Sequence, residues 1–300
     1  MIVPRETNFM KFLSECPSCG SSLIKEFIRS KDFFLSKEEF RIFQCSACGL
    51  KFTNPRPEDK DLSSYYQSEE YLSHSEKNKS FISFTYRTIR KINIKRKFKI
   101  VKNYSKGRSI LDIGCGTGEF LAYCQKKGMN VTGIEPDKKA KEFATAMHHL
   151  EIWDENVLDK ASPAFDIVTL WHSLEHVSDI NKRFLQIRRV LKPGGTVIIA
   201  VPNSDSYDAE LFGEFWAAYD LPRHLYHFNQ DTFNFIARKF EFSLVKTIPM
   251  KWDSFFISLL SKKYRSGRNE YINAVFNGLR SNFHARSHQN NYSSLIFILK

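Results

Sequence analysis

The sequence predicts an α/β fold with a doubly wound, mostly parallel sheet, preceded by a small cysteine-containing module. Two observations predict the sheet. From residue 109 onward, apolar strand-like segments alternate with amphipathic helical segments, which is the order that produces parallel sheets. A glycine-rich turn follows the first of these strands, where such sheets bind their ligands. A third observation, two closely spaced cysteine pairs before residue 50, predicts the separate module.

Length and composition are consistent with this division. The chain has 300 residues, of which 42% are hydrophobic and 26% charged, enough for one large α/β domain and a small module. Its apolar runs are too short to span a bilayer, and its N-terminus has no apolar core of signal-peptide length. We therefore expect a cytoplasmic protein with no membrane span. The net charge of +12 permits an anionic partner without requiring one.

Four cysteines define the N-terminal module. Cys16 and Cys19 stand in CPSCG, Cys45 and Cys48 stand in CSACG, and 25 residues separate the two motifs. A C-x-x-C turn brings two thiolates to one ion, so two such turns predict a closed, tetrahedral zinc site with a structural role. A pair of disulfides or redox motifs is the alternative, which a cytosolic setting disfavours. Strand-like segments separate the motifs, and we place this zinc ribbon at residues 1–57.

A strongly basic segment leads from the ribbon into the sheet. Between Arg87 and Arg108 there are ten Lys and Arg residues and no acid. Ile94, Phe98 and Val101 follow helical spacing, which predicts an amphipathic helix with a basic outer face. We favour a solvated face for these charges, and an anion-binding strip is the alternative.

The main domain begins at residue 109 and continues to residue 300. Strands are predicted at 109–113, 130–134, 150–153, 165–171, 196–202, 242–250 and 293–300, with a helix at 179–191 and a turn at 192–195. Two further helical stretches, at 254–264 and 269–283, precede the last strand. They could shape an acceptor pocket, pair two subunits of a homodimer or cover the sheet edge.

The glycine turn distinguishes between two cofactor classes. A dinucleotide site requires G-x-G-x-x-G and a later acid. Glu135 supplies the acid, but the turn has G-x-G-x-G, and Glu119 stands where the last glycine is needed. A carboxylate at a helix N-terminus opposes a pyrophosphate, and Asp112 adds a second negative charge. This field suits a cofactor with a positive head, such as S-adenosylmethionine (SAM), which carries a sulfonium and an ammonium group.

Four successive motifs, ILDIGCGTGEFL, GIEPD, FDIVTLWHSLEHV and LKPGGTVIIAVPN, resemble those of class I SAM-dependent methyltransferases over residues 109–250. The resemblance implies a seven-stranded, Rossmann-like sheet, with the glycine turn against the methionine part of SAM and Glu135 on the ribose hydroxyls. Pro136 and Asp137 would flank the adenosine, and Asp154 or Glu155 would lie near the adenine amine. The full set of cofactor-binding residues predicted in this domain is Asp112, Gly114, Cys115, Gly116, Thr117, Gly118, Glu135, Pro136, Asp137, Asp154, Glu155 and Trp171.

A candidate lid precedes the basic helix, so residues 58–108 are treated as one lid-and-helix segment. Tyr71 could close over the cofactor, and packing between the modules is the alternative. Trp171 could attract the sulfonium through its aromatic face. Cys115 is expected to be a small packing residue of the turn rather than a nucleophile.

The segment LWHSLEHV places His172, Glu175 and His176 in the order H-x-x-E-H, which also occurs in a class of zinc proteases. Its position directly after the fourth strand argues against protease chemistry. Some quinone-type O-methyltransferases carry a similar E-x-x-E-H stretch associated with a divalent metal, but His172 replaces the first Glu here. We therefore predict that His172 lies at the methyl-transfer centre and leave open whether it contacts the acceptor, the cofactor or an ion.

Acceptor residues are expected in an insertion at 205–229, which is rich in aromatic side chains and contains Arg223, His224 and His227. Its PRHLYHF stretch resembles a segment of many small-molecule methyltransferases. We predict that His224 is the general base, because histidine titrates in the required range, with Arg223 and His227 as positioning groups. The alternative is a surface loop that packs on the sheet.

The leading hypothesis is a SAM-dependent methyltransferase that modifies an O or C atom of a small or carrier-linked molecule, such as a sugar or polysaccharide precursor. The paired knuckles resemble the N-terminal module of some sugar C-methyltransferases. An RNA methyltransferase is the alternative, because zinc ribbons and basic surfaces suit nucleic acid, although no N/D-P-P-[FYW] motif follows the fourth strand. A non-catalytic SAM-binding module that holds a protein partner is the third hypothesis.

Overall fold

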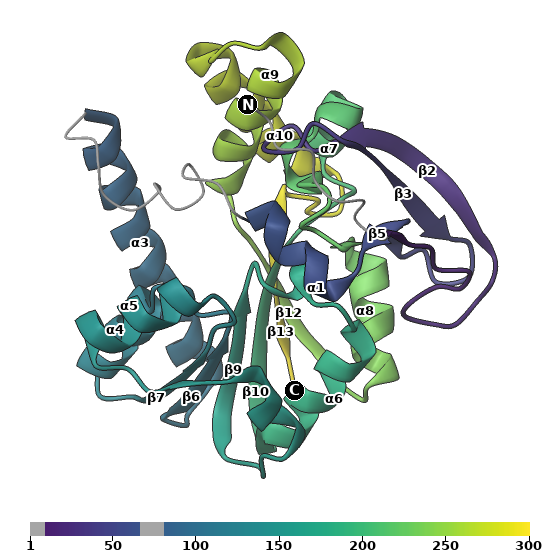
Figure 1. Cartoon of the computed structure of the whole chain (residues 1–300). Coiled ribbons are helices and arrows are strands. Elements are labelled where there is room, and N and C mark those ends of the chain that lie inside the picture. Colours follow the sequence, from purple (N-terminus) through teal and green to yellow (C-terminus); the bar gives the residue numbers. More distant parts are fainter. Residues whose placement is uncertain (1–9, 67–80) are drawn as a thin grey trace.

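The computed structural model describes residues 10–66 and 81–300, and this part of the chain contains one large sheet and two smaller sheets, of four and two strands (Figure 1). The large sheet has seven strands in the order β12-β13-β10-β9-β6-β7-β8. Only β13 runs antiparallel to its neighbours, so the prediction of a mostly parallel, seven-stranded sheet is confirmed. Its strands are β6 (Ser109–Ile113), β7 (Asn130–Ile134), β8 (Ile152–Trp153), β9 (Phe165–Trp171), β10 (Leu191–Pro202), β12 (Leu244–Pro249) and β13 (Ser294–Leu299).

Helices cover both faces of this sheet, because side chains on successive strand positions point to opposite faces. On one face, Leu111 of β6 belongs to a buried cluster with Phe184 and Phe233 of the helices α6 and α8. On the other, Ile110 belongs to a cluster with Val101 of α3. The helices concerned are α3 (Phe81–Tyr104), α4 (Glu119–Lys126), α5 (Lys138–His148), α6 (Ile180–Val190) and α8 (Gln230–Lys239).

Two details differ from the predicted elements. The turn predicted at 192–195 lies inside β10, where the pairing with β9 shifts register between Leu191 and Thr196. The extra residues form an irregularity at the start of a long strand, and Gly194 takes the positive φ (72°) that this irregularity requires. The third predicted strand is reduced to the two residues of β8, which lies at the edge of the sheet as described and pairs with β7.

The N-terminal module contains β1 (Met10–Lys11), β2 (Ile24–Lys31), β3 (Glu39–Cys45), β4 (Lys51–Thr53) and β5 (Arg56–Pro57), followed by α1 (Asp59–Leu62). A strand from far along the sequence, β11 (Tyr226–His227), pairs antiparallel with β4. The second sheet therefore has the order β11-β4-β3-β2. The predicted insertion completes the sheet of the ribbon and joins the two parts of the chain.

The insertion is largely buried. After α7 (Tyr207–Phe212) it passes through two short 3₁₀ turns to β11, and Trp216, Leu221 and Tyr226 are almost inaccessible to solvent. The Trp216 indole N–H donates to Asp208 at 2.9 Å. The alternative of a surface loop is therefore wrong, because these aromatic side chains form the core between the ribbon and the sheet.

Two helices, α9 (Asp253–Ser266) and α10 (Tyr271–Ser287), form a hairpin between β12 and β13. Figure 1 shows them together at one end of the molecule, beyond the sheet. Within residues 10–66 and 81–300, no helix has the length and apolar character needed to cross a bilayer.

Candidate functional site

The loop between β6 and α4 has the backbone that its glycines predict. Gly114, Gly116 and Gly118 have φ values of 78°, 55° and 80°, a region that other residues rarely adopt. A Cβ atom at Gly114 would lie 2.5 Å from Ser173 Cβ, whereas a Cβ at Gly116 would meet nothing within 4 Å. Gly116 thus leaves its backbone open to a ligand.

Glu135 follows β7 and points into this loop. Its two carboxylate oxygens accept the Gly116 N–H at 2.7 Å and the Asp137 N–H at 2.9 Å. Partial burial raises the pKa of Glu135, because a carboxylate loses hydration there. Asp137 itself caps α5 by accepting the Ala140 N–H. The structure brings Glu135, which the resemblance assigns to the ribose, to the glycine loop, which the resemblance assigns to the methionine part of SAM.

A cleft of about 680 Å³ lies beside Glu135. It is lined by Pro136, Asp154 and Glu155 together with residues of α5, and its volume is in the range of small-molecule sites. Asp154 pairs with Lys141 at 2.5 Å, and Glu155 pairs with Arg183. Of the residues predicted to surround the adenosine, Pro136, Asp154 and Glu155 therefore line one cleft with Glu135, whereas Asp137 is not part of its lining. The choice between Asp154 and Glu155 for the adenine amine stays a prediction.

Negative charge lies beneath the loop. Asp112 is buried and accepts the Thr169 hydroxyl at 2.6 Å. Burial raises the pKa of Asp112 to about 6, although this hydrogen bond and the Lys97 charge oppose the rise. Lys97 reaches in from α3 and places its Nζ 4.6 Å from the Trp171 ring centre. A cation thus already occupies the aromatic face that was predicted for the sulfonium.

The basic helix also touches the loop at a second point. Arg90 pairs with Glu119 at 2.6 Å, and its guanidinium lies 3.4 Å from the Thr117 hydroxyl. Six of the basic residues are exposed, as the preferred interpretation of a solvated basic face expects: Lys91, Lys95, Lys99, Lys102, Lys106 and Arg108. Arg90 and Lys97 depart from it, because they face the loop. Cys115 packs against Gly133, where an added Cβ would lie 2.6 Å from its sulfur. Burial raises the pKa of the Cys115 thiol, which disfavours the nucleophilic thiolate.

His172 directly follows β9 and is held between two carboxylates. Its Nδ1 lies 3.4 Å from Glu175 and its Nε2 lies 3.2 Å from Asp253 at the start of α9. Burial disfavours the imidazolium, but the two carboxylates outweigh it and raise the pKa of His172 to about 9. His172 is therefore a cation near neutral pH, and its φ of 55° shows that the backbone bends sharply there.

A second cluster lies behind His172. Ligand atoms of Glu175, His176 and His224 all lie within 4.8 Å of one another. The Glu175 carboxylate is fully buried, and apart from its ion pair with His172 it has no hydrogen-bond partner in the described part of the chain. This set could hold a divalent metal. It contains Glu175 and His176 of the H-x-x-E-H stretch but not His172, and it gains His224 from the insertion.

Backbone carbonyls orient both histidines of this cluster. His224 Nδ1 lies 2.8 Å from the Ala218 carbonyl oxygen, and His176 Nδ1 lies 3.0 Å from the Arg223 carbonyl oxygen. A carbonyl can only accept, so each Nδ1 carries a proton and each Nε2 keeps its lone pair. Burial and the neighbouring His224 lower the pKa of His176 to about 4.

The other two residues predicted in the insertion are buried in the framework. The Arg223 guanidinium pairs with Asp220 at 2.6 Å and with Asp32 at 2.9 Å. His227 lies in β11, with its Nε2 3.2 Å from the Thr53 hydroxyl, and Thr53 also donates to the His224 carbonyl at 2.7 Å. Both side chains therefore fix the loop that carries His224.

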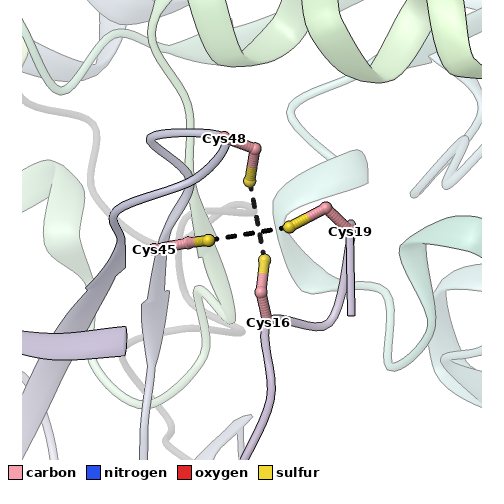
Figure 2. A group of neighbouring side chains, drawn as sticks. All are labelled: Cys16, Cys19, Cys45 and Cys48. Atoms are coloured by element: carbon pink, nitrogen blue, oxygen red, sulfur yellow. Dashed lines mark hydrogen bonds between the residues drawn. The ribbon is translucent and has the colours of Figure 1, made fainter. Parts of the chain in front are cut away.

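The four ribbon cysteines converge on one point (Figure 2). Cys16 and Cys48 sulfurs are 3.6 Å apart, as are those of Cys19 and Cys45. Disulfide sulfurs lie only about 2 Å apart, so the disulfide alternative is wrong. Four thiolates around zinc have edges of about 3.8 Å, which the observed distances fit. Each knuckle ends at a glycine with φ of 77°, Gly20 or Gly49.

Sequence reasoning missed three groups near the site. Asp253 comes from a helix whose position only the fold reveals, and Asp220 gave no signal beyond its place in the insertion. Lys97 was visible only as one cation in a basic run. Tyr71, the predicted lid residue, lies outside the described residues.

Known proteins resemble this chain in sequence. Residues 86–247 match the model of a family described as a methyltransferase domain. A ubiquinone biosynthesis O-methyltransferase of Alkalilimnicola ehrlichii is 35% identical over 136 residues, which are 42% of this chain and 55% of that protein. The protein of the same name from Pseudomonas aeruginosa is 33% identical over 135 residues, 41% of this chain and 58% of the relative. The chain thus spans little more than half the length of these relatives.

Solved structures show a similar fold. A SAM-dependent methyltransferase from Archaeoglobus fulgidus aligns with a TM-score of 0.50 and 19% identity, over 74% of this chain and 100% of that one. Phosphoethanolamine N-methyltransferase 2 from Haemonchus contortus, solved with SAM, aligns with a TM-score of 0.52 and 17% identity. The alignment covers 92% of this chain and 68% of that one. At these identities the likeness concerns the fold alone.

Proposed function

The chain belongs to the methyltransferase-domain family, whose model matches more than half of it, and on that premise we propose that it transfers a methyl group from SAM to an oxygen or carbon atom of a small or carrier-linked molecule. The observation that carries the proposal is Glu135 pointing into a glycine loop that is open at Gly116. Relatives named for O-methylation support oxygen as the acceptor atom.

The residues around the loop suit SAM. Glu135 presents two carboxylate oxygens, which can accept hydrogen bonds from a ribose diol in exchange for the amides that they now bind. Asp112 supplies a negative charge for the cationic methionine part. Lys97 occupies the face of Trp171, and we propose that it moves aside when the sulfonium arrives, since like charges repel.

SAM supplies the methyl group, and its carbon–sulfur bond breaks as the acceptor atom attacks in line. The protein must hold the two reactants aligned and take the proton from a hydroxyl acceptor. We assign the proton to Nε2 of His224, which keeps its lone pair because Nδ1 donates to Ala218. The Asp220 carboxylate, 3.9 Å from that nitrogen, would stabilise the resulting imidazolium. His172 is the weaker base candidate, because its raised pKa keeps it protonated.

A second role for the same cluster is favoured by the buried Glu175 carboxylate, which pairs with His172 at 3.4 Å but accepts no hydrogen bond within the described residues. In this role Glu175, His176 and His224 would hold a divalent ion, which could orient an acceptor with neighbouring oxygens. Metal-binding histidines usually donate their other N–H to a carbonyl or carboxylate, as His176 and His224 do here. His224 would then be a ligand rather than a base.

We also propose that the four ribbon thiolates hold a structural zinc ion. The support is their convergence and sulfur spacing (Figure 2). Because all four ligand positions are protein thiolates, such an ion would stabilise the module and leave no position open for chemistry.

The experiment combines SAM binding with acceptor screening. Calorimetry should detect SAM binding, and its absence would overturn the proposal. Tritiated SAM is then offered with phenolic acceptors, sugar-linked acceptors and ribosomal RNA. Label that appears in RNA alone would favour the RNA alternative, and SAM binding without transfer to any acceptor would favour a non-catalytic module.

Substitution of His224 tests the base. His224→Asn should lower the rate by roughly 10²–10⁴-fold, whereas His288→Asn, at the exposed end of α10, should not. If His224 is the base, dialysis that removes Mg²⁺ and Mn²⁺ but leaves the ribbon zinc in place keeps activity intact at neutral pH. If it is a metal ligand, the same dialysis abolishes activity and added Mg²⁺ or Mn²⁺ restores it.

A further inference from the structure

Helix α10 has its large apolar side chains on the outside. Ile272, Val275, Phe276, Leu279 and Phe283 follow the spacing of one helix face, and their exposed fractions run from 51% to 86%. The opposite face, which packs on the protein, consists of Ala274, Gly278, Ser281 and Ala285. A surface helix normally has the reverse pattern, with large apolar residues inside.

Small residues on the inner face allow close packing on α9 and α7. A Cβ at Gly278 would lie 2.6 Å from the Phe255 ring, and Ser281 donates to the buried Asp208 at 2.8 Å. The orientation of α10 is therefore fixed, and the apolar stripe cannot turn inward. Two more exposed apolar side chains, Trp252 and Phe256, lie at the start of α9. Several large apolar side chains exposed on one helix face indicate a binding surface.

The hairpin that carries the stripe is strongly basic. From residue 251 to 287 it has seven Lys and Arg residues against two acids. Both acids are already paired, Asp253 with His172 and Glu270 with Lys262. The basic residues are Lys251, Lys262, Lys263, Arg265, Arg268, Arg280 and Arg286.

We propose that the α9–α10 hairpin docks on an anionic lipid surface, with the α10 stripe inserted among the lipid chains and the basic residues over the head groups. Aromatic and aliphatic side chains beside Lys and Arg are the pattern of helices that lie in the plane of a membrane. The hairpin would lie on the bilayer rather than cross it, in keeping with the absence of a spanning helix among the described residues. This inference does not depend on the methyl acceptor.

Charge distinguishes this occupant from a second copy of the chain. Two copies that paired through α10 would bring two hairpins with the same positive excess together, and no unpaired hairpin carboxylate is present to offset the repulsion. An anionic head-group layer removes that repulsion. The charge of the hairpin therefore complements lipid.

Vesicle sedimentation tests the proposal with the full chain. The protein should bind vesicles that contain phosphatidylglycerol, bind pure phosphatidylcholine vesicles weakly, and be released by salt. The double variant Phe276→Ser/Phe283→Ser should lower partitioning by about tenfold or more. A matched control, Met147→Ser/Leu185→Ser, removes similarly exposed apolar side chains from α5 and α6 and should bind as the unaltered protein does.

A charge variant separates the two parts of the interaction. Lys263→Gln/Arg265→Gln should weaken binding to phosphatidylglycerol vesicles, whereas Lys138→Gln/Lys139→Gln on α5 should not. Failure of the unaltered protein to bind anionic vesicles would overturn the proposal. So would a dimer, detected by light scattering, that the Phe276/Phe283 variant converts to monomer, because a second copy would then cover the stripe. Because SAM binding is measured separately, either failure leaves the proposed enzymatic function untouched.

Discussion

One carboxylate oxygen of Glu135 accepts the Gly116 amide at 2.7 Å, which joins the end of the second parallel strand to the middle of the glycine loop. The bond spans the gap between β7 and the loop after β6. A ribose diol has two hydroxyl donors, one for each carboxylate oxygen of Glu135. The ribose can therefore replace the backbone amide in this contact. The loop is thus shaped around the acid that is predicted to bind the cofactor.

Replacing Glu135 by Gln should weaken SAM binding by roughly 10- to 100-fold. The amide keeps one acceptor but loses the charge that strengthens both hydrogen bonds to the ribose, a change of about 1.4–2.8 kcal/mol. Titration calorimetry measures the change directly. Glu142→Gln is the matched control, because Glu142 lines the same cleft without bonding to the loop. Equal effects of the two substitutions would show that general negative charge, rather than the Glu135 position, binds SAM.

Replacing Asp112 by Asn should stabilise the unliganded protein in a pH-dependent way. The pKa of Asp112 is about 6 in the fold against an ordinary value of 3.8. Below about pH 4 the acid is protonated in both states and costs nothing. Between about pH 4 and pH 6, Asp112 is ionised in the unfolded chain but still largely protonated in the fold. The free-energy cost of burying its charge grows over this range and is complete above about pH 6.

The free energy of unfolding of Asp112→Asn should therefore exceed that of the unaltered protein by about 1–3 kcal/mol near pH 7.5, with no gain near pH 4. Urea denaturation across this range measures the difference. SAM affinity should fall in the same variant, because the cationic methionine part loses its counter-charge. A gain in stability that is constant with pH would contradict the assigned role of the buried charge.

Much of the fold could be predicted because it depends on local patterns. The strand at Ser109–Ile113, the glycine loop and the acid Glu135 are close in sequence, and their spacing alone fixes their relation in a parallel sheet. The cysteine cluster could be predicted for the same reason, since each C-x-x-C turn forms locally and the ion requires both.

The acceptor side could be predicted only in part. The PRHLYHF stretch identified His224, but it did not show that Arg223 is buried against Asp32, which lies 191 residues earlier. Nor did the H-x-x-E-H stretch show that Asp253 would hold His172. These contacts join distant segments, and neither side-chain period nor motif spacing specifies which distant charges meet.

Replacing Cys45 by Ser should remove the bound zinc and destabilise the ribbon. Cys45 is fully buried at the end of β3, and a neutral hydroxyl is a poor substitute for a thiolate ligand. We expect a loss of about 3 kcal/mol or more in the free energy of unfolding. Metal content by mass spectrometry checks the first effect and denaturation the second. The Cys124→Ser variant is the control, because Cys124 is also buried but lies outside the cluster, and this variant should keep the ribbon zinc. Loss of zinc from the control as well would point to general unfolding.

Replacing Asp32 by Asn should weaken the contact between the ribbon and the insertion that carries Arg223. Arg223 is 1% exposed and pairs with both Asp32 and Asp220. Removing one carboxylate leaves a buried cation partly uncompensated. Burial alone would raise the pKa of Asp32, but Arg223 outweighs it and holds that pKa below its ordinary range. Asp32 thus contributes stability at neutral pH, and this contribution is lost as the pH falls through its lowered pKa.

We therefore expect Asp32→Asn to lower the free energy of unfolding by about 2–4 kcal/mol at neutral pH, with a smaller difference in acid. Glu39→Gln is the control, because its pair with Lys31 is solvent-exposed and should contribute less than about 0.5 kcal/mol. Since the Arg223 carbonyl orients His176 and the loop carries His224, methyl transfer should fall together with stability while SAM affinity changes little. Weakened SAM binding with unchanged turnover would instead show that the ion pair between Asp32 and Arg223 acts on the cofactor side of the site.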